Sequence, residues 1–226
     1  MDSFRAWCLL FTDIARILLV INTVLVILLS FGRIPKEISA LRGFLLIDAV
    51  TEWLAKWLAV LQVNNLPLLH LYTPLEFLTI SWFFKVVFAD WVLFQRYFYI
   101  WVVIVLAFLI GNSIFLEPLT GFNSNAKTLT QIIIITYATA YFFRSFGKID
   151  FSEKSAFAIA LVNVGILFYY SGSLFIFMFS KALNSPEFLA NTNIQVFFWM
   201  LNGALFLLFQ ILIFIATWKV ARIRIP

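Results

Sequence analysis

Five ionisable side chains lie inside long apolar stretches of this 226-residue chain, and their types suit proton transfer and polar recognition. Asp48, Glu52 and Lys56 lie in the second stretch, and His70 and Glu76 lie in the third. Carboxyl and imidazole groups exchange protons, and a lysine neutralises a carboxylate. A charge near the centre of a bilayer costs roughly 2.5–3.5 kcal/mol, so a membrane protein must pair it, hydrate it or use it.

The composition predicts an all-α, polytopic integral membrane protein. The chain is 63% hydrophobic and 12% charged, with a mean hydropathy of +1.00. Soluble domains are typically about 45–50% apolar and about 25% charged. Seven membrane helices need about 140 residues, which leaves short loops and no room for an ordinary soluble domain. Any chemistry should therefore lie in the helix bundle or at its mouths.

A single seven-helix transmembrane domain is predicted over residues 1–226. The expected helices span about 7–31, 38–63, 66–88, 97–115, 128–146, 155–179 and 192–220. Residues 38–63 are the most polar of these, so the alternative remains that they do not cross fully. The acidic Asp2 and the interruption by Arg16 argue against a cleaved leader, so the first helix is expected to be retained. Pro74 should kink the third helix or free a backbone carbonyl.

Basic residues predict the orientation. Eleven fall in the loops after the first, third and fifth helices and in the C-terminal tail, against three on the other side. The first set is Arg33, Lys36, Arg42, Lys85, Arg96, Arg144, Lys148, Lys154, Lys219, Arg222 and Arg224; the second is Arg5, Lys127 and Lys181. The positive-inside rule then places the N-terminus outside and the C-terminus in the cytoplasm. The net charge of +5 is therefore explained by basic residues that set the topology in a lipid bilayer. No nucleic-acid partner is expected.

Helical spacing groups the buried charges. Asp48, Glu52 and Lys56 are spaced by four and share one face. The connection to the next helix is short, so these two helices should be antiparallel neighbours, with Glu52 and Glu76 at similar depth. Asp13 and Arg16, three apart, should form an ion pair near the outer end of the first helix.

Two interpretations of this cluster compete. In the structural one, Lys56 neutralises Glu52 or Glu76, and His70 hydrogen-bonds to the asparagine-rich turn at residues 64–67. In the functional one, an outward-facing pocket or proton-linked site binds a ligand. Its candidate residues are Glu52, Lys56, His70, Tyr72, Glu76, Asn112 and Asn202.

Several kinds of site are not expected. One cysteine and one histidine argue against a disulfide and against multi-histidine metal centres, so no metal and no cofactor is expected. The chain lacks the serine-hydrolase elbow, the zinc-protease helix motif and the phosphate-binding loops. Other intramembrane polar residues are expected to join helices rather than bind ligands: Thr130, Asn163, Ser171 and Ser173.

Three segments carry a resemblance to a known group. Residues 65–77 read NLPLLHLYTPLEF, residues 168–175 read FYYSGSLF, and residues 193–199 read NIQVFFW. These are similar to a poorly characterised family of bacterial seven-helix membrane proteins, which resembles the membrane sensory modules of histidine kinases. The resemblance covers most of the chain. It implies a receptor-like module of the bacterial inner membrane that passes a signal to a partner, such as a histidine kinase or another membrane protein.

Three functions follow as hypotheses. The first is a stand-alone seven-helix sensor or accessory module with an outward-facing polar pocket. The second is a small transporter or channel subunit that uses the buried carboxylates, with Pro74 marking a discontinuous helix. The third is an intramembrane lipid-modifying enzyme using Glu52, His70 and Glu76 as acid–base groups. The absence of an evident nucleophile makes a non-enzymatic function the preferred expectation.

Overall fold

The computed structural model describes residues 2–147, 152–179 and 192–221, which form helices and no strands. Seven helices are long: α1 (Asp2–Leu29), α3 (Arg42–Val60), α4 (Leu66–Val87), α5 (Val92–Gly111), α6 (Ser124–Ser145), α7 (Lys154–Met178) and α10 (Thr192–Ala221). Two elements are short: the helix α2 (Lys36–Ser39) and the π-helical turn η1 (Asn112–Leu116). The prediction of an all-helical chain is therefore confirmed over the described residues.

Four helical segments are long and apolar enough to cross a membrane: Leu10–Leu29, Val92–Leu116, Lys154–Met178 and Val196–Ala221. They lie in α1, in α5 with η1, in α7 and in α10, and they fit the predicted membrane protein. The remaining long helices, α3, α4 and α6, have 19, 22 and 22 residues and fall short in composition rather than length. Seven crossings and the orientation stay predictions.

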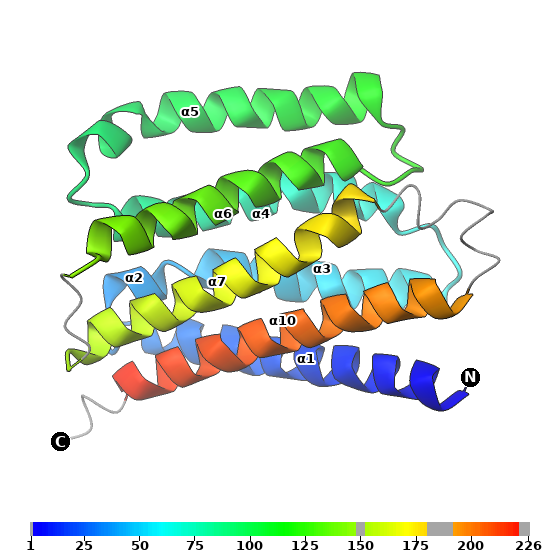
Figure 1. Ribbon diagram of the computed structural model, residues 1–226, viewed down its shortest axis with the longest axis horizontal. Coiled ribbons are helices and arrows are strands. Elements are labelled where there is room, and N and C mark those ends of the chain that lie inside the picture. Colours follow the sequence, from blue (N-terminus) through cyan, green and yellow to red (C-terminus); the bar gives the residue numbers. More distant parts are fainter. Residues whose placement is uncertain (1, 148–151, 180–191, 222–226) are drawn as a thin grey trace.

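Six of the long helices form a closed ring. Each packs against the next in the order α1, α3, α4, α6, α7, α10 and back to α1, whereas α5 packs outside the ring against α4. Figure 1 shows the helices running side by side, with the start of α1 and the end of α10 at opposite ends of the bundle. We call these the α3–α4 end, where α3 passes into α4, and the α4–α5 end.

The prediction of one continuous helix over residues 38–63 is wrong. The chain forms α2, turns through Ala40 and Leu41, and then forms α3, which ends at Val60. The amide of Leu41 donates to the carbonyl of Ile38 at 3.1 Å, a bond over three residues that tightens the chain at this point. Ile38 and Leu41 are fully buried, so the turn is held by the apolar core. The buried turn therefore holds the start of α3, at Arg42, against the neighbouring helices.

Helix α4 runs continuously through Pro74. In the turn before this proline, the carbonyl of Leu69 accepts hydrogen bonds from Thr73 Oγ1 at 2.9 Å and Asn123 Nδ2 at 3.0 Å. Proline removes a backbone donor from a helix, and these side chains add polar contacts around the weakened turn. The discontinuous helix that the transporter hypothesis invoked at Pro74 is therefore not observed.

Small residues bring α7 close to α10. A Cβ atom at Gly165 would lie 2.7 Å from Cδ2 of Phe209, and one at Gly172 would lie 2.5 Å from Cδ1 of Leu205. Between them, the Tyr169 ring stacks on Phe209, with ring centroids 5.6 Å apart. Small residues permit this approach, which is common between membrane helices. The contact positions Tyr169 and its neighbour Tyr170 toward the interior of the ring of helices.

Candidate functional site

An ion pair buried inside the ring joins α4 to α6. Nζ of Lys127 lies 2.6 Å from Oε2 of Glu76, and the side chains are 2% and 0% exposed. The ammonium also lies 4.8 Å from the centroid of the Tyr72 ring and 5.1 Å from that of Phe177. Counting Lys127 among the loop charges was therefore wrong. Its place in the first turn of α6 allows the long side chain to reach back into the bundle.

Glu76 has hydrogen-bond donors on both carboxyl oxygens. Lys127 donates to Oε2, while the hydroxyls of Tyr72 and Tyr170 lie 3.1 and 3.0 Å from Oε1. These donors come from three helices, α6, α4 and α7. A buried carboxylate is tolerated when it is both paired and hydrogen-bonded, and Glu76 meets both conditions.

Asp48 shares the Tyr72 hydroxyl with Glu76. The Tyr72 oxygen lies 2.9 Å from Oδ1 of Asp48 as well as 3.1 Å from Oε1 of Glu76. A phenol carries one hydrogen and donates to one acceptor at a time. Asp48 is 3% exposed, and its Oδ2 is buried with no hydrogen-bond partner in the described part of the chain. The Asp48–Tyr72–Glu76 chain can therefore hold a proton on Asp48 or pass one along it.

The sequence predicted similar depths for Glu52 and Glu76, but the contacts from α3 to Glu76 run through a different carboxyl group. The carboxyl group linked to Glu76 through Tyr72 belongs to Asp48, one helical turn before Glu52. The packing of α3 against α4 is as expected.

A second charged group joins α1 to α3. Arg16 donates from Nε to Glu52 at 3.0 Å and from NH1 to Asp13 at 3.0 Å, which confirms the predicted Asp13–Arg16 pair. Lys56 also binds Asp13, at 2.8 Å. The prediction that Lys56 neutralises Glu52 or Glu76 is therefore wrong, because Arg16 and Lys127 take those positions. The bond between Arg16 and Glu52 was not predicted, because the two residues are 36 positions apart and lie on different helices.

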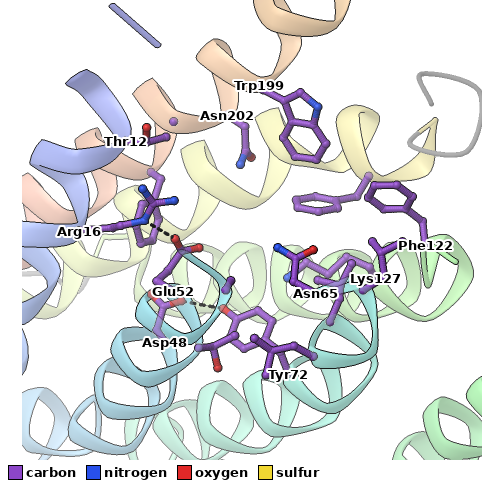
Figure 2. A pocket seen from close by; sticks show the side chains of 18 of the residues that line it. Thr12, Arg16, Asp48, Glu52, Asn65, Tyr72, Phe122, Lys127, Trp199 and Asn202 are labelled. Carbon is purple, nitrogen blue, oxygen red and sulfur yellow. Dashed lines mark hydrogen bonds and ion pairs between the residues drawn. The ribbon is translucent and has the colours of Figure 1, made fainter. Parts of the chain in front are cut away.

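These two charged groups border a cavity of about 380 Å³ at the α3–α4 end of the bundle. All six helices of the ring contribute to its wall, and α5 contributes none of the lining residues. In Figure 2, Arg16, Glu52 and Asp48 lie on one side, while Lys127, Phe122 and Trp199 lie on the other. The wall thus combines charged groups with aromatic rings, among them Tyr72, Tyr169, Phe177 and Phe206.

The candidate residues from the sequence separate into two sets. Glu52, Tyr72 and Asn202 line the cavity, and Glu76 lies behind it in contact with Tyr72 and Lys127. Lys56, His70 and Asn112 are absent from its lining. The structure therefore brings together about half of the predicted pocket residues.

His70 instead binds the segment that joins α5 to α6, and Asn112 is part of that segment. The His70 ring lies 2.9 Å from Ser113 Oγ through Nδ1 and 3.1 Å from the Gly121 carbonyl through Nε2. The predicted bond from His70 to the asparagine-rich turn is therefore wrong. Asn112 donates to Oε2 of Glu117 at 2.7 Å. The His70 contacts tie this segment, which follows the peripheral helix α5, to α4 of the ring.

Arg16, Asp48, Lys127 and Tyr170 were not among the candidate site residues. A sequence signal for Lys127 does exist: Lys127, Thr130 and Gln131 recur at helical spacing on one face, and all three are buried. Gln131 donates to Ser173 at 2.8 Å across α6 and α7, the helix-joining contact expected of Ser173. Within the residues that the structure describes, no group of three or more His, Cys, Asp or Glu side chains could hold a metal ion.

No family model, no curated protein and no solved structure matches this chain. A fold alone does not determine a function, and function resides in the chemistry of specific sites. The basis for a functional conclusion is therefore the cavity and the charged residues around it.

Proposed function

We propose that this protein is a stand-alone membrane sensor whose cavity at the α3–α4 end binds a small polar organic molecule. The observation that carries the proposal is the cavity itself, lined by charged and aromatic side chains from six helices. Ligand pockets typically have volumes of about 300–1,000 Å³ and combine apolar walls with a few polar groups that orient the ligand. The cavity of about 380 Å³ has this size and this lining.

Ligand binding at this place suits signal transmission. A ligand shifts a conformational equilibrium by the difference of its contacts in the two states. One molecule in this cavity would touch α1, α3, α4, α6, α7 and α10 at once, so a change in their packing would reach the opposite end of the bundle. The helix ends there carry basic residues: Lys36 in α2, Arg42 at the start of α3, Lys85 in the last turn of α4 and Arg144 in the last turn of α6.

The proposed orientation completes this scheme. With the N-terminus outside, the cavity faces the exterior and the α4–α5 end faces the cytoplasm of a bacterial inner membrane. A separate protein, such as a histidine kinase or another membrane protein, would receive the signal at that cytoplasmic face. The charge bias in the sequence and the placement of the cavity at the opposite end support this part of the proposal.

A stability screen tests the proposal. Protein in lipid nanodiscs is heated with small organic compounds of cationic, anionic, zwitterionic and neutral type, because a ligand that binds only the folded state raises Tm. The matched control is Ala55→Phe, which places a ring in the cavity wall. We expect at least one compound to raise Tm in the unmodified protein and not in Ala55→Phe. No compound-specific shift in any charge class would contradict a ligand-binding cavity.

A transporter is the second candidate, favoured by the Asp48–Tyr72–Glu76 chain, which links two carboxyl groups through one hydroxyl. Intramembrane acidic groups linked in this way serve proton-coupled transport. Proteoliposomes loaded with a pH indicator separate the two functions. Uptake of a compound from the screen together with protons, absent from protein-free liposomes, would establish transport. Binding of that compound without flux would establish the sensor.

The contacts give less support to a lipid-modifying enzyme. Its proposed acid–base groups were Glu52, His70 and Glu76, and of these only Glu52 lines the cavity. Both ring nitrogens of His70 contact Ser113 and Gly121, away from the carboxyl groups. The three groups therefore do not converge on one substrate position, as general acid–base catalysis requires.

A further inference from the structure

The charges around the cavity do not balance. Four carboxyl groups and three basic groups make up the two charged clusters: Asp13, Asp48, Glu52 and Glu76 against Arg16, Lys56 and Lys127. The basic groups all take part in ion pairs, and the pairs account for Asp13, Glu52 and Glu76. The carboxyl group of Asp48 is the one without a basic partner in these clusters.

None of the cations near Asp48 is available to pair with its carboxyl group. Its neighbours are Glu52 on the same helix, Tyr72 and Glu76 on α4, Lys127 on α6 and, at the cavity wall, Arg16 on α1, with Tyr169 and Tyr170 on α7. The two nearby cations already bind Glu76 and Glu52, and the Tyr72 hydroxyl has one hydrogen for two acceptors. A buried carboxylate without a counter-charge is costly, so Asp48 needs either a proton or an external cation.

The cavity that Asp48 lines suits an organic cation. Aromatic rings of Tyr169, Phe177, Trp199 and Phe206 line the same space as Asp48. Aromatic faces attract ammonium groups and pack against apolar bodies. Asn202, which also lines the cavity, has a buried Oδ1 without a hydrogen-bond donor among the described residues, so it adds an acceptor.

From this geometry we infer that Asp48 exchanges its proton for the ammonium group of an organic amine bound in the cavity. The inference rests on the proposed function and names the class of ligand. In the empty site, Asp48 is neutral and hydrogen-bonded to Tyr72. When a protonated amine enters, the Asp48 proton leaves to the solvent and the carboxylate pairs with the ammonium, so the charge of the site stays unchanged. No covalent bond to the ligand forms.

Isothermal titration calorimetry of the full chain in nanodiscs tests the exchange. The probes share an aromatic body and differ in charge: phenethylamine, phenethyl alcohol and hydrocinnamate. We expect phenethylamine to bind most tightly, with release of about one proton per amine, detected by comparing buffers of different ionisation enthalpy. Its affinity should increase from mildly acidic to mildly alkaline pH, because proton and amine compete for Asp48. Binding of the amine without proton release would overturn the inference.

Two variants locate the effect at Asp48. Asp48→Asn keeps the size of the side chain and should weaken phenethylamine by about tenfold or more while leaving phenethyl alcohol unaffected. The matched change Asp90→Asn removes a carboxylate at the α4–α5 end, outside the cavity wall, that has Arg144 as its partner, and it should leave the proton release intact. An Asp48→Asn protein with unchanged amine affinity would overturn the inference.

The probes also separate this inference from the proposed function. Preference for hydrocinnamate or phenethyl alcohol over the amine would overturn the assignment of an amine ligand and would still establish a ligand-binding cavity. If the stability screen finds a ligand that is blocked by Ala55→Phe but is not an amine, the sensor stands and the inference falls. If the screen finds no ligand of any charge class, both fall.

Discussion

The 2.6 Å ion pair between Lys127 and Glu76 links α4 to α6 inside the ring, with both side chains shielded from solvent. Glu76 also accepts hydrogen bonds from tyrosines on α4 and α7, so its carboxyl group has partners on three helices. Without a partner, either charge would remain in an apolar interior. The pair is thus both a structural link and one boundary of the cavity, which Lys127 lines.

Breaking this pair from one side should destabilise the protein strongly. Glu76→Gln or Lys127→Met leaves the other charge buried and unpaired, which typically costs about 3–5 kcal/mol. The double variant should lose less than the sum of the two single losses. The free energy of unfolding in mixed micelles measures all three proteins.

The exposed ion pair between Lys56 and Asp13 serves as the control. Its side chains are 38% and 45% exposed, so Lys56→Met should change the free energy of unfolding by about 1 kcal/mol or less. Equal effects of Lys56→Met and Lys127→Met would contradict the assignment of Lys127 to the bundle interior.

The sequence predicted the helices much better than it predicted their contacts. Continuous apolar runs determine where a helix can form, so α4 and α7 agree with their expected bounds within about a residue. Ion-pair partners depend on the register between helices. Glu76 and Lys127 are separated by 51 residues, and no local pattern indicates which cation faces which acid. The sequence predicted an ion pair of Lys56 with Glu52 or Glu76, yet Lys56 binds Asp13 on α1.

The close approach of α7 to α10 predicts a steric effect at Gly165. In Gly165→Ala, the added methyl group would lie 2.7 Å from the Phe209 ring, which must move, at a typical cost of about 1–3 kcal/mol. Gly111→Ala is the matched control, because its Cβ atom would meet nothing within 4 Å. Thermal unfolding should show a lower Tm for Gly165→Ala alone. A Tm equal to that of the unmodified protein would mean that α7 and α10 are further apart.

Removal of the Tyr72 hydroxyl should disturb more groups than removal of the Tyr170 hydroxyl. Tyr72→Phe takes a hydrogen-bond partner from both Asp48 and Glu76, whereas Tyr170→Phe takes one from Glu76 alone. Loss of a partner from a buried polar group costs about 1–3 kcal/mol. We expect the larger decrease in the free energy of unfolding for Tyr72→Phe. The reverse order would contradict the proposed sharing of one hydroxyl between two carboxyl groups.

The orientation is testable with single cysteines. In a Cys8→Ser background, Val63→Cys places an exposed thiol at the α3–α4 end, and Ala89→Cys places one at the α4–α5 end. With the N-terminus outside, a membrane-impermeant maleimide added to intact spheroplasts should label Val63→Cys and spare Ala89→Cys. Permeabilised cells should label both thiols. Labelling of Ala89→Cys alone in intact cells would reverse the predicted topology.

The cavity itself could not have been predicted from the sequence. Its wall combines residues as distant as Arg16 and Phe206, and it exists because six helices close into a ring. The polar residues that the sequence singled out on α3 and α4 are partly found here, because Glu52 and Tyr72 are part of the wall. His70 lies outside the wall, and helical position alone does not show that its ring faces Gly121.

The central claim is that the cavity at the α3–α4 end binds a small organic ligand. An electron cryomicroscopy map of the protein in nanodiscs, prepared with phenethylamine and without it, tests that claim most directly. We predict added density between Asp48 and the rings of Tyr169 and Trp199 when the amine is present. Identical maps, with the side chains of the wall packed against one another and no space between them, would contradict it.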